Sequence, residues 1–182
     1  MMKRFCPEME TTLCSTSGTC DRVFAEFVET GRADAFFYNV DAKLMVQQYE
    51  AWQELTENAW VIRSDIKTPS GFVPAGFMVF QQGPGQARFC HFSAYPGFDE
   101  IVVPMGLDIE QWAFSNGNLS SLVGLTPKPY RHVTSFFKQA GFEPVGTIPG
   151  ACYIAKHDRY CDGVVSVCTR ESLTAAMERQ EA

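Results

Sequence analysis

Three polar or titratable side chains alternate along one β-rich stretch of the sequence, residues 87–95. His91, Ser93 and Tyr95 lie two residues apart, so a strand places them on one face, together with Phe89. Histidine has an unperturbed pKa of about 6.5, which suits it to accept a proton from an attacking nucleophile. His91 is therefore our candidate general base, with Ser93 beside it on the same face. The alternative is a core histidine whose ring nitrogens are satisfied by neighbouring groups.

Other residues could supply the same chemistry. Glu57 and Asp65, near the ends of early elements, are alternative bases. The phenol hydroxyls of Tyr95, Tyr130 and Tyr153 are candidate proton donors. Cys90 precedes His91 directly, so on a strand the two side chains face opposite ways and cannot form a thiolate–imidazolium pair. A cysteine hydrolase is therefore not expected.

The seven cysteines do not form a recognisable framework. They are odd in number and scattered, and no apolar export segment follows the basic N-terminal residues, so we expect reduced thiols in a cytoplasmic protein. Cys152, His157, Cys161 and Cys168 follow the pattern C-x4-H-x3-C-x6-C, within the loose range of zinc ligands. Because no C-x-x-C pair is present, we predict buried thiols rather than a metal site.

Composition limits the possible partners. The chain has 182 residues and a formal net charge of −6. That balance disfavours binding to nucleic-acid phosphates, and no apolar run approaches the roughly 20 residues needed to cross a bilayer. We therefore expect neither a nucleic-acid nor a membrane partner. Lys128, Arg131 and Lys138 form a small basic group, which is either an anion contact or a solvated helix face.

The pattern of apolar residues predicts one α/β domain over residues 19–182, preceded by a flexible N-terminal arm, residues 1–18. We expect helices at 20–30, 41–57, about 104–116 and 129–140 with a polar C-terminal helix, and strands at 35–40, 60–64, 73–80, 87–95, 119–125, 143–154 and 163–169. Three meander strands followed by a strand–helix–strand unit indicate a mixed antiparallel and parallel sheet flanked by helices.

This element order is similar to that of the GCN5-related N-acetyltransferase (GNAT) superfamily. The similarity in sequence is concentrated in residues 119–150, where the helix before the last two strands ends in Gly141-Phe142 and Gly146 follows. In that superfamily this helix commonly reads Asn-x-x-Ala-x-x-x-Tyr-x-x-x-Gly-Phe, and here Val133 stands at the alanine position. The chain also resembles short, divergent GNAT-like chains of tailed phages and prophages.

The resemblance implies an acyl-CoA-dependent N-acetyltransferase. Its sheet would open into a V between the third meander strand and residues 119–125. Acetyl-CoA would be the donor substrate, and an amine would be the acceptor. The resemblance is also compatible with a homodimer. His91 would act as base, Ser93 would lie beside the acyl group, and Tyr130, at the start of its helix, would protonate the departing thiolate. The implied donor contacts are Phe92, Ala94, Tyr95, Gly97, Phe98, Lys128 and Arg131.

The chain also departs from the superfamily pattern. Phe137 stands where the tyrosine that often protonates the thiolate is usual, and Tyr130 replaces the usual asparagine. Glycines 97 and 106 are not at the spacing of the pyrophosphate loop, and Asp99-Glu100 would repel phosphate. The alternative function is therefore a catalytically inactive GNAT-like binding or assembly protein, such as a phage structural or accessory protein.

Overall fold

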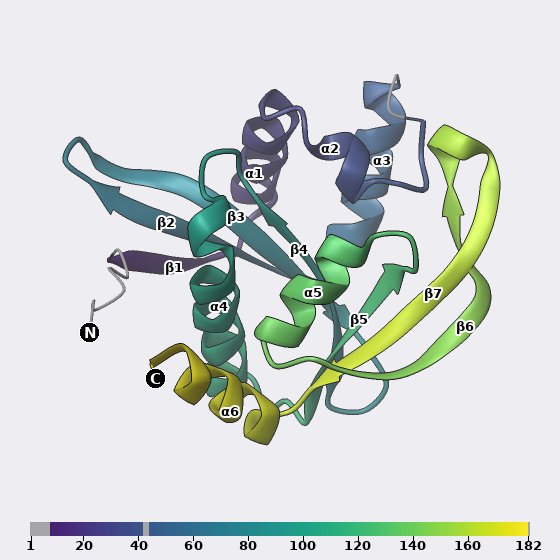
Figure 1. Ribbon diagram of the computed structural model, residues 1–182. Helices are drawn as coiled ribbons and strands as arrows, with labels where there is room; N and C mark the ends of the chain where they lie inside the picture. Colours follow the sequence, from purple (N-terminus) through teal and green to yellow (C-terminus); the bar gives the residue numbers. More distant parts are fainter. Residues whose placement is uncertain (1–7, 42–43, 182) are drawn as a thin grey trace.

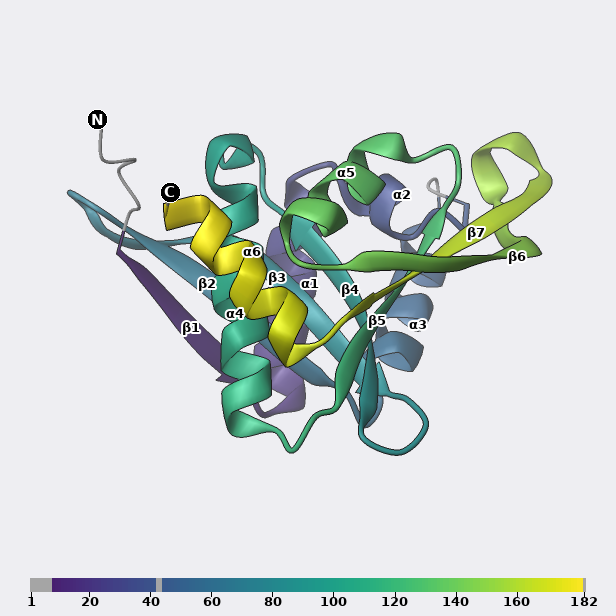
Figure 2. The same cartoon turned by 60° about the horizontal axis from the view of Figure 1, so that its bottom comes forward.

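The computed structural model describes residues 8–41 and 44–181. They form one mixed sheet of seven strands with three helices on each face (Figures 1 and 2). The strand order is β1-β2-β3-β4-β5-β7-β6. The strands are β1 (Met9–Cys14), β2 (Trp60–Thr68), β3 (Gly71–Gln82), β4 (Ala87–Ala94), β5 (Ser121–Pro127), β6 (Glu143–Ile154) and β7 (Arg159–Cys168). The α-helices are α1 (Ser17–Glu29), α2 (Ala33–Phe36), α3 (Met45–Thr56), α4 (Val102–Asn116), α5 (Arg131–Gln139) and α6 (Arg170–Glu181). The mixed α/β class is confirmed.

The sheet separates at one position. β4 and β5 are parallel neighbours through three residue pairs, of which the last is Phe89 with Val123. Beyond that pair the strands diverge, and Figure 1 shows them joined at one end and splayed at the other, with α5 in front of the gap. The V that the resemblance implied is therefore present between β4 and β5.

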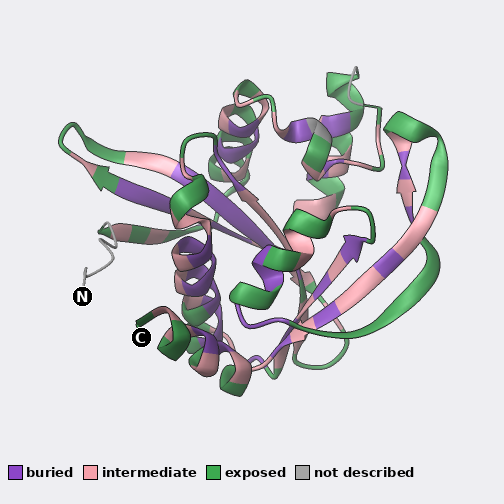
Figure 3. Cartoon of the chain, viewed as in Figure 1, coloured by how far each residue is buried: buried purple, intermediate pink, exposed green. Residues whose placement is uncertain are grey.

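Each face of the sheet carries its own apolar core. One core joins α4, α5 and α6 to the sheet through residues such as Met105, Phe136 and Leu173. The other joins α1, α2 and α3 through Phe27, Phe37 and Trp52. Burial is accordingly densest along the central strands and on the inner side of α4, while most of β6 is exposed (Figure 3). β3 lies between the cores and contributes side chains to both, Met78 and Phe80 to the first and Phe77 and Val79 to the second.

Two helix boundaries follow from local sequence signals. α5 ends in a left-handed Gly141 with φ of 89°, and the N–H of Phe142 donates to Phe137 O at 2.8 Å. The rings of Phe137 and Phe142 stack with centroids 4.5 Å apart, which completes the expected helix ending. Pro104 lies in the first turn of α4, where its missing N–H costs no helical hydrogen bond.

Three predictions about the early chain differ from the structure. Residues 35–40 were expected to form a strand, but α2 and a turn occupy them, because Phe36 and Phe37 both pack on Phe27 rather than facing opposite ways. Met9–Cys14, assigned to the flexible arm, pairs with β2 as the edge strand β1; residues 1–7 lie outside the described part. The helix expected over 41–57 is α3, which begins at Met45 with Leu44 as its N-cap.

None of the helices in the described residues combines the length and the apolar character needed to span a membrane.

A single glycine in β3 controls how closely β4 approaches. A Cβ added at Gly76 would lie 2.6 Å from the backbone O of Ser93 and 2.9 Å from Met105 Cε. Because a backbone atom cannot rotate away, we expect Gly76→Ala to lower the free energy of unfolding by about 1 to 3 kcal/mol in urea denaturation. Gly146→Ala is the matched control, since a Cβ there meets no atom within 4 Å. Equal stabilities of the two variants would contradict this assignment.

Candidate functional site

A cavity of about 350 Å³ fills the gap between β4 and β5. Consecutive residues of β4 face opposite sides of the sheet, yet His91, Phe92, Ser93 and Ala94 all line this cavity. That is possible only because β5 has left the side of β4. The cavity therefore runs through the sheet, and reaches side chains of both faces.

The backbone of β4 presents hydrogen-bonding groups to this cavity. The N–H of Tyr95 donates to Ala75 O on β3 at 2.7 Å. In an antiparallel ladder, alternate residues direct their N–H and C=O to the same side, so Phe92 and Ala94 direct theirs away from β3 and toward the gap. Arg32 Nη1 donates to the outward carbonyl of Ala94 at 3.3 Å, which agrees with this direction.

His91 lies on the α2 side of the cavity as a neutral ring. Gln81 Oε1 lies 3.1 Å from its Nε2, so the ring donates through Nε2 and keeps the lone pair on Nδ1. Burial lowers the pKa of His91 from its usual value to about 4. The ring of Phe36 packs edge-on against it, with centroids 6.3 Å apart. The structure thus places His91 and Ser93 together, as the sequence analysis expected.

Tyr130 closes the cavity from the start of α5. Its ring meets that of Tyr38 at 83° with centroids 6.0 Å apart, and the ring of His132 also stacks on it, with centroids 6.0 Å apart. Partial burial raises the pKa of the Tyr130 hydroxyl above its usual value, so the group is protonated at neutral pH. Tyr130 can therefore donate a proton into the cavity.

Aromatic rings also form the wall on the α5 side. Phe92 of β4 stacks on Phe136 of α5 with centroids 4.6 Å apart. Phe137 lines the same wall, and its ring occupies the space that a side chain at Gly124 would need, with Cε2 2.5 Å from the position of a Cβ. Phe137, which stands where the GNAT superfamily usually has a tyrosine, is thus packed into the core and has no hydroxyl.

An ion pair stands at the mouth of the cavity near the start of α4. Arg32 Nη2 lies 3.1 Å from Asp99 Oδ1, and both side chains line the cavity together with Val102, the first residue of α4. Asp99 belongs to a short 3-10 turn, Asp99–Ile101, that leads into the helix. The carboxylate that would repel phosphate is therefore paired with a cation.

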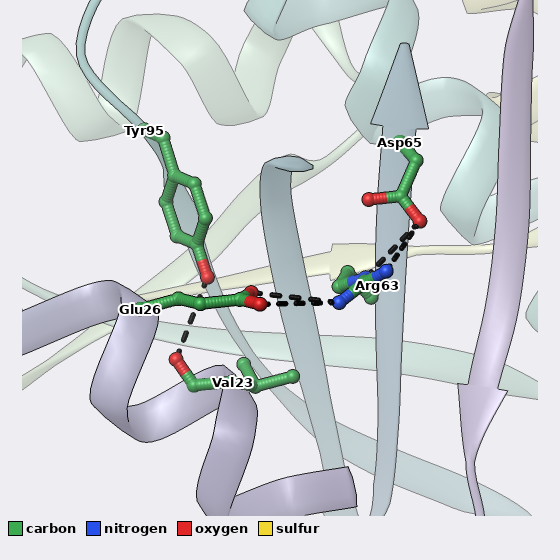
Figure 4. A network of polar contacts seen from close by, with 5 residues as sticks. All are labelled: Val23, Glu26, Arg63, Asp65 and Tyr95. Atoms are coloured by element: carbon green, nitrogen blue, oxygen red, sulfur yellow. Dashed lines mark hydrogen bonds and ion pairs between the residues drawn. The ribbon is translucent and has the colours of Figure 1, made fainter. Parts of the chain in front are cut away.

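Two residues from the sequence analysis serve the core instead of the cavity. The ring of Tyr95 is buried against α1, and its hydroxyl donates to Val23 O at 3.4 Å (Figure 4). Asp65, an alternative base, accepts from Arg63 Nη2 at 2.8 Å, and Arg63 also pairs with Glu26 of α1. This network fastens α1 to β2, so neither Tyr95 nor Asp65 lines the cavity.

The remaining predicted residues lie around the cavity rather than in it. Gly97, with φ of 88°, forms an exposed turn, and Phe98 packs against both cores. Lys128 Nζ pairs with Asp162 at 3.1 Å, while Arg131 is exposed at the start of α5. None of these four residues lines the cavity.

The alternative acid, base and metal residues also lie apart from it. Glu57 borders a separate groove beside α1 and α3, and Tyr153 donates to Asp158 at 2.7 Å. Within residues 8–41 and 44–181, no three His, Cys, Asp or Glu side chains gather as a metal site requires. Cys152 instead accepts a hydrogen bond from Tyr38, with the oxygen and sulfur 3.8 Å apart.

The sequence analysis missed the part of the cavity wall that α2 and its flanks supply. Arg32, Phe36 and Tyr38 come from α2 and its flanks, the segment in which a strand was expected at 35–40. Their only sequence signal is the aromatic run Phe36-Phe37-Tyr38, which is compatible with a strand or with a packed turn. Tertiary packing on α1 decided between the two.

The sequence matches no known protein family and no curated protein. Solved structures do match the fold. Spermidine N-acetyltransferase from Vibrio cholerae, in complex with CoA and spermine, superposes with a TM-score of 0.67 at 9% identity over 91% of this chain and 98% of that one. For ribosomal-protein-S5-alanine acetyltransferase from Vibrio fischeri the TM-score is 0.64 at 13% identity, over 90% and 93% of the two chains. An acetyltransferase of the GNAT family from Streptococcus pneumoniae gives 0.62 at 11%, over 89% and 99%.

At these identities the comparison establishes the fold. The chain has the GNAT fold, as the sequence resemblance implied, and the three solved structures compared above are acetyltransferases.

The burial of His91 makes the stability of the protein dependent on pH. Because its pKa is about 4 when folded and about 6.5 when unfolded, the unfolded chain binds a proton first as the pH falls. Stability is therefore lost between pH 6.5 and pH 4. We expect the unfolding free energy of the wild type, relative to His91→Gln, to fall by up to about 3 kcal/mol over that range.

Urea denaturation at several pH values measures this difference. His132→Gln, which removes an exposed histidine of α5, is the control. A difference between the wild type and His91→Gln that does not change with pH would refute the assignment.

Proposed function

We propose that this protein is an acyl-CoA-dependent N-acyltransferase that transfers an acetyl or other acyl group to an amine by direct attack. The amine nitrogen forms a bond to the thioester carbon, and the carbon–sulfur bond breaks. One proton leaves the nitrogen, and one proton is taken up by the departing CoA thiolate. The products are an amide and CoA.

The observation that carries this proposal is the gap between β4 and β5. An extended pantetheine chain fits such a gap because its amide groups can pair with the backbone of Phe92 and Ala94, which point into it. The thioester oxygen would then lie near a strand N–H, which can stabilise the negative charge that develops on it. Since the cavity runs through the sheet, the amine can approach from the α2 side.

Two residues have proton-transfer roles in this proposal. His91 is neutral at pH 7, and its Nδ1 lone pair can accept the proton of the attacking amine. Because the pKa of His91 is low, the ring then releases this proton readily. Tyr130 donates its phenol proton to the thiolate, in place of the hydroxyl that Phe137 lacks. Ser93 lies beside His91 and contacts the acyl group.

The nucleotide end of the donor would lie outside the cavity. The start of α4 offers a positive helix end to the phosphates, and Arg32 can exchange its Asp99 partner for a phosphate oxygen. Contacts from Gly97, Phe98, Lys128 and Arg131 belong to this part of the proposal, whereas the buried Tyr95 can contribute only its backbone.

A second candidate function is a binding or assembly protein that keeps the fold without the chemistry. The specific observations in its favour are the buried ring of Phe137 at the usual acid position and the carboxylate of Asp99 at the phosphate end. A phage or prophage origin, a cytoplasmic location, a homodimer, and the lack of nucleic-acid or membrane partners remain predictions from the sequence. Donor binding distinguishes the two functions.

We expect acetyl-CoA and CoA to bind the purified protein with micromolar dissociation constants, equivalent to about −8 kcal/mol, in titration calorimetry. Ser93→Trp should abolish this binding because the indole ring fills the cavity that Ser93 lines. Ser115→Trp, an equal change at an exposed position of α4, should leave it unaltered. No binding at millimolar ligand would overturn the acyltransferase and leave the binding or assembly protein.

The Tyr130 hydroxyl is expected to act in the chemical step alone. Tyr130→Phe should lower kcat by roughly 100-fold, the usual size of a general-acid contribution, with little change in acetyl-CoA affinity. Release of the CoA thiol in the presence of each of a panel of primary amines measures kcat, and calorimetry measures the affinity for acetyl-CoA. Tyr160→Phe, at a side chain that is 71% exposed, is the control. An unchanged kcat would remove Tyr130 from the mechanism.

A further inference from the structure

The side of the cavity that faces α2 is walled by aromatic rings held in place. Phe36 packs edge-on against Phe77 of the core, with centroids 5.4 Å apart, and against His91. Tyr38 is fixed at both ends, since its backbone O accepts from Ala155 N at 2.8 Å and its hydroxyl bonds to Cys152. Its ring meets Tyr130 across the gap. These rings therefore form a preorganised surface.

The charges around this surface are neutralised. Asp99 is the only carboxylate among the described side chains that line the cavity, and Arg32 is paired with it. His91 carries no charge at neutral pH. A polyamine with several ammonium groups would lose its hydration here without gaining carboxylate partners.

We infer that the acceptor is an amine attached to an aromatic ring, with a single positive charge at most. This inference rests on the proposed function and names the substrate class of the same site. Aromatic rings prefer the edge-to-face and offset arrangements that Phe36, Tyr38 and Tyr130 offer. The faces of the tyrosine rings can also hold one ammonium group, which releases one proton to solvent and becomes the neutral amine that attacks the thioester. The amine nitrogen would then lie beside His91.

Three amines test this substrate class with acetyl-CoA as the donor. 2-Phenylethylamine carries the ring, 2-cyclohexylethylamine has a similar size and charge without aromaticity, and spermidine is the polycation. We expect kcat/KM for 2-phenylethylamine to exceed both others by about tenfold, measured by release of the CoA thiol. Calorimetry of each amine with the CoA-loaded protein gives its affinity independently of turnover.

A matched pair of variants assigns the preference to the aromatic wall. Phe36→Leu should reduce the ratio between 2-phenylethylamine and 2-cyclohexylethylamine to near one. Phe89→Leu, on the same face of β4 at a ring that is 40% exposed and outside the cavity, should leave the ratio unchanged. Retained CoA binding by Phe36→Leu shows that the variant is folded; if it does not fold, Tyr38→Leu takes its place.

The outcomes separate this inference from the function on which it rests. Donor binding with equal or faster transfer to spermidine or to 2-cyclohexylethylamine overturns the aromatic acceptor and leaves the acyltransferase standing. If no amine is acetylated, a tenfold tighter binding of 2-phenylethylamine that Phe36→Leu removes supports the inference, and equal binding overturns it. Absence of donor binding overturns both.

Discussion

The parting of β4 and β5 is the constraint on which the rest of the structure depends. Three residue pairs join the two strands, and beyond Phe89 they are no longer paired with each other. The resulting cavity is closed by elements from both faces, with α2 on one side and α5 on the other. The two apolar cores fix different sets of helices to the two faces of β3, so helices from both faces of the sheet can wall the cavity.

Local signals were sufficient wherever a residue type allows one conformation. Gly141 and Phe142 specified the end of α5, Pro104 specified the first turn of α4, and the alternation along 87–95 assigned His91 and Ser93 to one face. The mixed sheet followed from the order of these elements. The Gly-Phe ending and the element order also carried the resemblance that the solved structures confirm at the level of fold.

Where several conformations suit the same residues, long-range packing decided. Phe36 and Phe37 have good strand propensity, but both rings are required on α1, and only a helical turn provides that. The ion pair between Arg32 and Asp99 joins residues 67 positions apart, so no short pattern indicates it. Tyr95 shares its face with His91, yet α1 covers it and leaves His91 beside the cavity. Spacing along a strand predicts the face of a side chain and not which helix covers it.

The outward amides of Phe92 and Ala94 also have a consequence for hydrogen exchange with solvent. Their neighbours His91 and Ser93 direct N–H groups to β3 and should exchange slowly, because a sheet ladder must open before exchange occurs. The two amides that face the gap have no strand beside them and should exchange quickly. New protection of the Phe92 and Ala94 amides would thus mark a molecule lying along β4 in the position of a missing neighbouring strand, whatever its chemistry.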